Sequence, residues 1–399
     1  MARALDRAGL LNGLVTKWCF TAEEARLAGA CGLPAKWVQR SAPALLQARL
    51  TRAPLADLRR CLGRLFRENS IQAGDRSFDR VDRVGAALLQ EGTGVVLARE
   101  DAALRSFEVA AHLGLPRVYI LPTPYVATVK GLVDREAAEF PEAFCKAELA
   151  ADFAPERLLR KKVELVRATH IFCMSSFVEQ SVRQAAHGLQ TFTLPLGADT
   201  SWSVPVGAKK EPVFLYAGNI SARKGVHRLL RAWKRLKAYR TYRLRLIGGL
   251  NLPRRFLTDY RDCFEHQPWM PRHALVCEYV RASAFVFNAL ADGFGNVLSE
   301  AMACGTPVLA SRNCGAPDVV TNEKEGLLFD YGDDAQLENA LDWALSNPSQ
   351  LAEMGECARE RVSGWSWEHF AGKFRNWIGS IMGILPPGPV QNTNAPLTR

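Results

Sequence analysis

The sequence predicts an α/β protein built from two doubly wound domains, in which parallel strands alternate with helices. Three observations lead to this prediction. The chain has 399 residues, which is too long for one typical core. Short apolar segments of strand length alternate with longer amphipathic segments, as in βαβ units. Near the middle, a polar segment with Pro and Gly, residues 203–212, has the composition of a linker between domains.

The first domain is expected over residues 1–202. Residues 1–65 have a helical pattern that is broken by Gly and Pro. After them, helices are expected at 79–90, 102–113, 156–168 and 176–186, and strands at 94–98, 117–121, 171–174 and 191–194. The short apolar strands between amphipathic helices indicate a parallel sheet that is covered on both faces.

The alternation is more regular in residues 213–365, which we expect to form the second domain. Strands are expected at 213–217, 242–247, 284–288, 308–311 and 326–329, and helices at 225–238, 296–304 and 334–345. A last helix is expected over 365–382, and residues 366–384 are set apart as a separate C-terminal segment. The Pro-, Asn- and Thr-rich residues 385–399 are expected to be a disordered tail.

Composition narrows the classes of protein. No apolar stretch is long enough to span a membrane, and the first residues lack the pattern of a secretory signal. The ten scattered cysteines fit a reducing compartment better than a disulfide scaffold. We therefore expect a cytoplasmic protein.

The formal net charge is +10, and residues 1–60 hold ten Lys and Arg against four acids. This segment could associate with anionic lipid at the inner face of the membrane, attract a phosphorylated acceptor, or be a solvated helical face. Nucleic acid is not an expected partner, because the basic residues are not interleaved with aromatic ones.

Cys263, His266, His273 and Cys277 have the spacing of zinc ligands. A zinc site there is one interpretation, and the preferred one is two loop histidines and two buried thiols.

Residues 218–225 (GNISARKG) follow an expected strand and open a helix. Glycines let a ligand approach the backbone closely, and the helix start offers unpaired N–H groups at the positive end of its dipole. Arg223 and Lys224 add two positive charges at the same place. This combination predicts a diphosphate site, although an exposed basic helix start has the same pattern.

Residues 292–300 (DGFGNVLSE) also lie between an expected strand and a helix, with Asp292 in the loop and Glu300 about one turn into the helix. Gly293 and Gly295 permit positive φ angles. Carboxylates accept paired hydrogen bonds from the neighbouring hydroxyls of ribose or hexose. The pattern predicts a sugar-binding loop, and the alternative is a glycine turn with one solvated acid and one acid on a helix face.

Together these segments resemble glycosyltransferase family 4. The resemblance also includes AMACGTPV at 301–308, GAPDVV at 315–320 and EGLLF at 325–329. It covers about residues 213–330, with a weaker match over 160–176 that includes Glu164, Ser175 and Ser176. It implies a GT-B architecture, with two Rossmann-like domains facing a cleft and a C-terminal helix around Trp367 crossing back. It also implies retention of anomeric configuration, and neither a metal nor another cofactor.

The resemblance assigns roles to residues of both loops. Arg223 and Lys224 would hold the donor diphosphate and stabilise the leaving group. Glu300 would bind the ribose hydroxyls, and Asp292 would contact the donor sugar and share in catalysis. The full donor-binding set implied is Gly218, Asn219, Arg223, Lys224, Asp292, Gly293, Phe294, Gly295, Asn296, Val297 and Glu300.

Several positions depart from the family pattern. Asp292 stands where Glu is usual, and Asn219 stands where many members have Arg, so Arg223 would supply that charge. The usual first-domain His is absent from residues 121–125 (LPTPY), which leaves Tyr125 as the acceptor-side candidate. His112 and His170 are expected to be structural. The opening strand and its glycine-rich loop are not recognisable, so either the first strand is absent or the start is late.

We therefore expect a retaining glycosyltransferase that moves a sugar from a nucleoside-diphosphate sugar to a glycan, lipid-linked or small-molecule acceptor. Three alternatives stay open: a nucleotide-sugar-binding protein that lacks transferase activity, a nucleotide-sugar epimerase, and a scaffold on the membrane surface.

Overall fold

A computed structural model describes residues 5–6, 10–16, 50–52, 70–90, 94–186, 188–199 and 209–384. The chain divides into two compact units. One is drawn from Met1–Ile120, Leu159–Ile171 and Ala371–Arg399, and the other from Leu121–Leu158 and Phe172–Phe370. Most of residues 1–65, linker residues 203–208 and the tail 385–399 lie outside the described residues.

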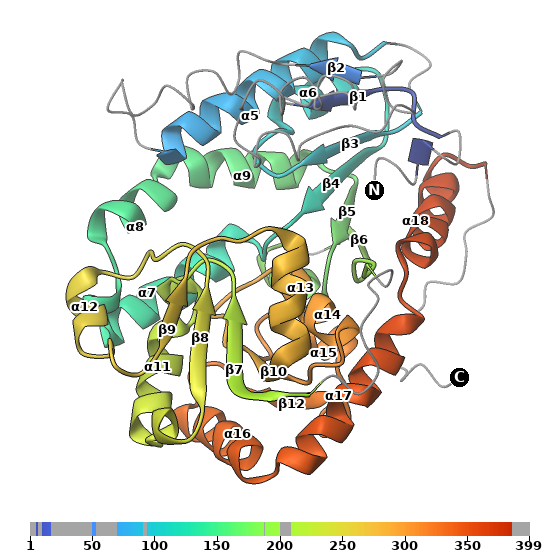
Figure 1. Cartoon of the computed structure of the whole chain (residues 1–399). Helices are drawn as coiled ribbons and strands as arrows, with labels where there is room; N and C mark the ends of the chain where they lie inside the picture. Colours follow the sequence, from blue (N-terminus) through green and yellow to red (C-terminus); the bar gives the residue numbers. More distant parts are fainter. Residues whose placement is uncertain are drawn as a thin grey trace, which may run out of the picture. The chain divides into compact units, whose positions relative to one another are not determined.

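A four-stranded sheet is formed by the strands expected in the first half of the chain, in the order β3-β4-β5-β6 (Figure 1). Its strands are β3 (Val96–Arg99), β4 (Arg117–Leu121), β5 (His170–Cys173) and β6 (Gln190–Thr193). The expected helices correspond to α5 (Ser70–Ala87), α6 (Leu104–His112), α9 (Pro155–Arg167) and α10 (Ser176–Ala185). The alternation of strand and helix is confirmed here.

The helical expectation for residues 1–65 is wrong at two places. Strands β1 (Leu14–Thr16) and β2 (Leu50–Arg52) pair in parallel as a separate two-stranded sheet. Val15 and Thr16 are β-branched and therefore favour extended backbone. The sequence analysis also missed helices between β4 and α9, namely α7 (Val126–Glu139), the 3-10 turn η2 (Pro141–Ala143) and α8 (Lys146–Asp152).

The second half of the chain forms a six-stranded sheet in the order β12-β11-β10-β7-β8-β9. Its strands are β7 (Glu211–Ala217), β8 (Arg243–Ile247), β9 (Glu265–Gln267), β10 (Ala282–Phe287), β11 (Val308–Ser311) and β12 (Gly326–Phe329). All its pairs are parallel. The chain order reverses where β7 lies beside β10, which makes this the topological switch point. β7 begins at Glu211, inside the segment that was expected to be linker.

Helices connect these strands, and α16, α17 and α18 follow the last strand, β12 (Figure 1). They are α11 (Val226–Arg235), α12 (Arg254–Thr258), α13 (Arg272–Arg281), α14 (Asn296–Ala303), α15 (Ala316–Val319), α16 (Asp334–Ser346), α17 (Pro348–Ser363) and α18 (Trp367–Ile381). α18 begins in the second unit, and its residues from Ala371 onward belong to the first. β9, α12, α13, α15 and α17 were not predicted.

The apolar stripe of α11 explains how this helix docks on the sheet. Trp233 is fully buried, and its ring lies 5.1 Å from that of Phe214 on β7, centroid to centroid. Phe214 in turn meets Tyr242 edge to face at 5.3 Å. Burying a large apolar side chain contributes about 1.5–3 kcal/mol, so this stack fixes the helix that follows the first candidate loop.

Of the four residues with zinc-like spacing, Cys263 precedes β9, His266 lies on β9, and His273 and Cys277 both lie on α13. His266 Nε2 is 2.8 Å from the Gly248 carbonyl oxygen. The loop assignment for both histidines is therefore wrong. Cys263 is buried and Cys277 is exposed. Within the part of the chain that the structure describes, no cluster of three or more His, Cys, Asp or Glu could hold a metal.

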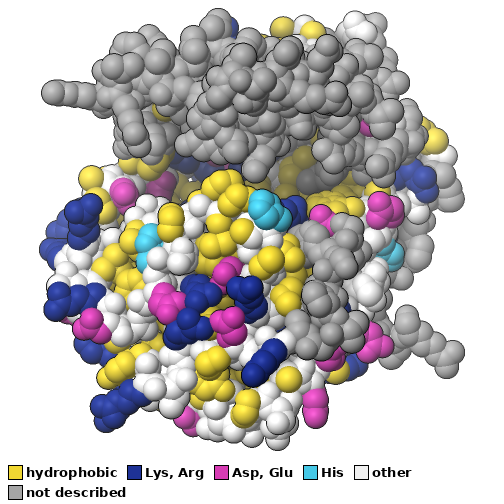
Figure 2. Space-filling model, viewed as in Figure 1, with side chains coloured by type: hydrophobic (Ala, Val, Ile, Leu, Met, Phe, Trp, Pro, Cys, Tyr) yellow, Lys and Arg dark blue, Asp and Glu magenta, His cyan; other side chains and the backbone are white. Residues whose placement is uncertain are grey.

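Basic residues are not confined to the start of the chain. Residues 228–261 hold eleven Lys and Arg and one acid, Asp259. Figure 2 shows dark blue Lys and Arg side chains over much of the visible face of the second unit, with magenta acids between them. Arg245, for example, lies between Glu265 and Glu278 at 3.0 and 2.5 Å. Among the described helices, none has the length and apolar character needed to cross a membrane.

Candidate functional site

The two segments predicted from the sequence meet at the switch point of the six-stranded sheet. β7 ends at Ala217 and leads into residues 218–225, here called the first loop, while β10 ends at Phe287 and leads into residues 288–295, the second loop. The Leu290 N–H donates to the Arg223 carbonyl oxygen at 3.2 Å, and Asn288 Nδ2 donates to that of Gly225 at 3.2 Å. Ligands of open parallel sheets bind at this position.

Gly225 lets the first loop fit against the second. Its φ of 67° is left-handed, and it separates the 3-10 turn η3 (Ala222–Lys224) from α11. A Cβ on Gly225 would overlap the Asn288 carbonyl oxygen and would lie 2.9 Å from Tyr331 Cε2. Only glycine is therefore compatible with both the backbone conformation and the space.

Gly218 and Asn219 form the start of the first loop. Gly218 has a φ of 146° and packs against Gly248, because a Cβ on Gly248 would overlap the Gly218 carbonyl oxygen. The Tyr216 hydroxyl donates to the Asn219 carbonyl oxygen at 2.8 Å, and the Asn219 side chain accepts a hydrogen bond from Asn251. The Asn219 side chain therefore braces the loop after β8.

The charged side chains of the first loop reach the second loop. Lys224 Nζ forms an ion pair with the Asp292 carboxylate, and these side chains are 26% and 16% exposed. Burial, and then the charge of the half-buried Arg223, lower the pKa of Lys224 to about 8, while the ion pair with Asp292 acts in the opposite direction. The structure thus brings together two of the three predicted catalytic residues.

Backbone contacts hold the second loop. A Cβ on Gly293 would overlap the Pro122 carbonyl oxygen, and the buried Ser175 hydroxyl donates to the Gly293 carbonyl oxygen. The Gly315 N–H donates to the Phe294 carbonyl oxygen at 3.0 Å, and Phe294 is buried. These contacts leave little freedom for the peptide groups that follow Asp292.

The second loop leads directly into α14. Gly295 caps this helix with a φ of 82°. The next residues, Asn296 and Val297, are exposed and half-buried, and N–H groups in a first helical turn have no acceptor within the helix. The loop can thus present backbone donors to an anionic or hydroxylated ligand.

Glu300 is engaged with two residues that the sequence analysis missed. Its Oε1 accepts from Arg272 Nη2 at 3.1 Å and its Oε2 from the Tyr279 hydroxyl at 3.3 Å. Burial raises the pKa of Glu300, and the charge of Arg272 opposes that shift. Both partners lie on α13, which was not predicted, although Pro271 immediately before it was an available start signal.

Ser175 and Ser176 connect α10 to the site. The Ser176 N–H donates to Asp318 Oδ2 on α15 at 3.0 Å, and Ser175 caps α10 by accepting from the Val178 N–H at 3.2 Å. Burial raises the pKa of Asp318 to about 6, and the bond from Ser176 opposes this shift. The start of α10 therefore contacts both the second loop and α15.

Tyr125 and Glu164, two further candidates from the first half of the chain, are buried and hydrogen-bonded within the fold. Tyr125 is only 6% exposed, and its N–H donates to Ser181 Oγ at 2.8 Å. Glu164 is fully buried and accepts from the Tyr119 hydroxyl and the N–H groups of Asp101 and Ala103 at 2.8, 2.9 and 3.1 Å. It therefore anchors the turn before α6.

His112 and His170 belong to the other compact unit. His112 is exposed in the last turn of α6. His170 Nδ1 lies 2.9 Å from Thr169 Oγ1, and its ring meets that of Trp377 edge to face at 6.5 Å.

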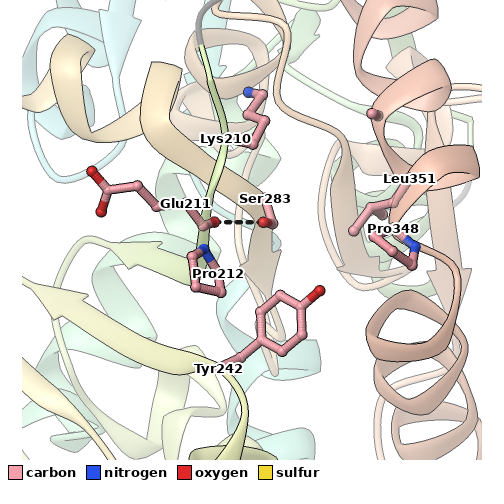
Figure 3. A pocket seen from close by; sticks show the side chains of 8 residues that line it. Lys210, Glu211, Pro212, Tyr242, Ser283, Pro348 and Leu351 are labelled. Carbon is pink, nitrogen blue, oxygen red and sulfur yellow. Dashed lines mark hydrogen bonds between the residues drawn. The ribbon is translucent and has the colours of Figure 1, made fainter.

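A pocket of about 230 Å³ lies at the ends of the strands opposite to the two loops, beside the first residues of β7 and β10 (Figure 3). Ser283 Oγ there donates to the Glu211 carbonyl oxygen at 2.6 Å, and Lys210 Nζ donates to Thr306 Oγ1 at 2.9 Å. Pro212, Tyr242, Pro348 and Leu351 supply most of the remaining wall. This pocket is distinct from the two loops, which follow the carboxyl ends of the strands.

Parts of the chain are similar to known proteins. Residues 200–361 match the family model of the glycosyl transferases group 1. A D-inositol 3-phosphate glycosyltransferase of Thermobifida fusca is 36% identical over 107 residues, which cover 27% of this chain and 25% of that protein. A GDP-mannose-dependent alpha-(1-6)-phosphatidylinositol monomannoside mannosyltransferase of Mycolicibacterium smegmatis is 28% identical over 200 residues, 44% of this chain and 52% of that protein. The matches thus span a quarter to a half of these curated relatives.

The likeness to solved structures covers more of the chain. Sucrose-phosphate synthase from Thermosynechococcus elongatus superposes with a TM-score of 0.61 at 23% identity, covering 79% of this chain and 80% of that one. HepE from Anabaena, solved in complex with UDP, gives a TM-score of 0.55 at 16% identity and covers 91% and 99%. The chain therefore has the GT-B fold, with two Rossmann-like parts, and its residues 200–361 are similar to the group 1 glycosyl transferases.

Proposed function

We propose that this protein is a retaining glycosyltransferase of family 4, which moves a sugar from a nucleoside-diphosphate sugar to a glycan, lipid-linked or small-molecule acceptor. The observation that carries the proposal is the meeting of Lys224, beside Arg223, with Asp292 at the switch point. Two cations next to glycine-lined backbone are suited to a diphosphate, and an acid next to them is suited to sugar hydroxyls.

In the proposed reaction, the acceptor hydroxyl attacks the anomeric carbon from the face on which the diphosphate leaves. The bond from the anomeric carbon to the diphosphate oxygen breaks, the new glycosidic bond forms, and the hydroxyl proton passes to the leaving phosphate. Arg223 and Lys224 stabilise the negative charge that develops there. Asp292 and the Phe294 and Gly295 amides orient the sugar, and Glu300 exchanges Arg272 and Tyr279 for the ribose hydroxyls. No metal is assigned a part.

The direct test is release of nucleoside diphosphate from UDP-, GDP- and ADP-sugars by the full chain. We expect release from one donor series, an anomeric configuration in the product equal to that of the donor by proton NMR, and no effect of EDTA. Lys224→Ala and Glu300→Ala should each lower the rate at least about tenfold, since each removes a charged hydrogen bond. Lys234→Ala is the matched control, because Lys234 is exposed on α11. Unchanged turnover in both site variants would refute the proposal.

A nucleotide-sugar-binding protein without transferase activity is the second candidate. It is favoured by the engagement of Glu300 with Arg272 and Tyr279 and of Lys224 with Asp292, which a donor must displace. Calorimetric titration separates the two, since this candidate predicts saturable donor binding without release of diphosphate. Peripheral association through residues 1–60 is a further proposal. Salt-reversible sedimentation with anionic vesicles tests it.

A further inference from the structure

Glu136, His227, Arg228 and Tyr331 form a buried cluster next to the first loop. Glu136 is on α7, and its side chain is 5% exposed. Its carboxylate lies 2.7 Å from His227 Nε2 and accepts hydrogen bonds from Arg228 at 2.6 and 3.0 Å and from the Tyr331 hydroxyl at 2.6 Å. Burial alone would raise the pKa of Glu136, but these partners lower it to about 2. The group is therefore a carboxylate at neutral pH.

Two partners of Glu136 belong to the first turn of α11. His227 is fully buried, and its ring is surrounded by those of Phe140, Phe144 and Phe256 at 5.1, 6.1 and 6.4 Å. Arg228 also donates to Asp334 at the start of α16 at 2.8 Å. Glu136 thus fixes the first turn of α11, which follows directly after the first loop.

The third partner, Tyr331, reaches the loop itself. Its Cε2 lies 2.9 Å from the position that a Cβ of Gly225 would occupy, while the Asn288 carbonyl oxygen is against the same position. The Tyr331 hydroxyl is held by Glu136. Gly225 is therefore confined between the second loop and a ring whose orientation Glu136 sets, and Lys224 is the residue immediately before it.

We propose that Glu136 and Tyr331 are positioning residues for the first loop, and that they hold Arg223 and Lys224 in the arrangement that binds the second phosphate of a nucleoside diphosphate. The inference rests on the proposed function, because it assigns the phosphates of the donor to this loop. Neither residue needs to touch the donor. Their effect passes through the ring of Tyr331 to Gly225, and through the first turn of α11.

The test compares ligands that differ by one phosphate. UDP, GDP and ADP, each paired with its monophosphate, are titrated calorimetrically into the full chain and into Tyr331→Phe, which removes one hydroxyl, and Glu136→Gln, which removes the charge. We expect Tyr331→Phe to lose about three- to tenfold in affinity for the diphosphate, the worth of one buried hydrogen bond, with the monophosphate unchanged. Glu136→Gln should lose more. Tyr239→Phe and Glu353→Gln are matched controls, because both residues are exposed.

The outcomes separate the inference from the proposed function. If the unaltered chain binds none of UDP, GDP and ADP, the proposed function fails and the inference fails with it. If that chain prefers diphosphate over monophosphate and Tyr331→Phe keeps the full preference, the inference alone is wrong. Equal losses for both ligands, with a lower unfolding temperature, would make the cluster structural only. Tyr331→Phe keeps the test decisive if Glu136→Gln does not fold.

Discussion

The two loops at the switch point are built in different ways. The first loop carries its chemistry in side chains, Arg223 and Lys224, and is held by a buried ionic cluster through Tyr331. The second loop carries its chemistry partly in backbone N–H groups. Close contacts of Gly293 with Pro122 and Ser175 hold this loop in place. Side-chain charge tolerates small displacements of the chain, since its energy falls slowly with distance. A backbone donor loses its hydrogen bond when it is displaced or turned away.

This difference matters for what each loop can bind. A flexible lysine can follow a diphosphate that shifts as bonds break, whereas a sugar ring must be oriented by fixed groups. We therefore expect changes in the first loop to act mainly on affinity for the diphosphate. Changes in the second loop should act mainly on turnover of the sugar.

The largest effect is expected where the two loops touch. Gly225→Ala would force a left-handed φ on alanine and drive its Cβ into the Asn288 carbonyl oxygen, so we expect about 3 kcal/mol or more of lost stability and no measurable diphosphate binding. Thermal unfolding and UDP and GDP titration measure both. Gly249→Ala is the control, because a Cβ at Gly249 meets nothing within 4 Å. Equal unfolding temperatures for the two variants would show that the loops are not locked together at Gly225.

Asp292→Asn is expected to change diphosphate affinity and donor turnover differently, and so to distinguish the roles of the two loops. The Asp292 carboxylate is paired with Lys224 and would compete with a donor phosphate for it. The variant should therefore keep or improve its affinity for UDP or GDP while donor turnover falls at least about tenfold. Lys224→Ala should instead lose about 10- to 100-fold in diphosphate affinity, the worth of one charge-assisted hydrogen bond. Calorimetry and release of nucleoside diphosphate give the two numbers for each variant. Parallel losses in both variants would mean that the loops bind the diphosphate as one unit.

The same contrast explains what the sequence analysis could predict. Arg223, Lys224 and Asp292 carry charge beside glycines at strand ends, so local pattern was enough to place them. The strands β4 and β11 were predicted with their bounds, because buried parallel strands are short apolar runs between clear breaks. The GT-B fold followed from this alternation together with the family resemblance.

The unpredicted part depends on contacts between distant residues. Glu136 meets His227 across 91 positions and Tyr331 across 195, and no local pattern marks such partners. Helices α7 and α13 were missed although Val126–Glu139 and Arg272–Arg281 are both regular. Tertiary packing stabilises such helices more than their weak local signals do. Tyr125 was chosen for its place after a strand, but its side chain is buried.

A smaller effect is expected at Asp318, on the side of the second loop. Burial raises the pKa of Asp318 from its ordinary 3.8 to about 6 in the folded protein, so the folded state holds this proton more tightly than the unfolded chain. Stability from this group is therefore greatest at low pH and is lost as pH rises from about 4 to about 6. Asp318→Asn should remove that dependence, and the variant should gain up to about 2 kcal/mol over the wild-type chain above pH 7. The free energy of unfolding of both proteins at pH 4.5, 5.5, 6.5 and 7.5 measures this dependence. The same pH dependence in both proteins would contradict the burial of the Asp318 charge.

The smallest effect is expected at Ser175, which has two roles. Ser175→Ala removes the cap of α10 and the hydrogen bond to Gly293. Asp333→Ala is the matched control, because Asp333 caps α16 by accepting from the Gln336 N–H at 2.9 Å and lies outside both loops. Each variant should lose about 1 kcal/mol of stability, the worth of a cap. Only Ser175→Ala should also lower turnover, by about three- to tenfold, with diphosphate affinity unchanged. If turnover is equal in the two variants, the contact with Ser175 does not orient the second loop, and Pro122 and Gly315 are sufficient to hold it.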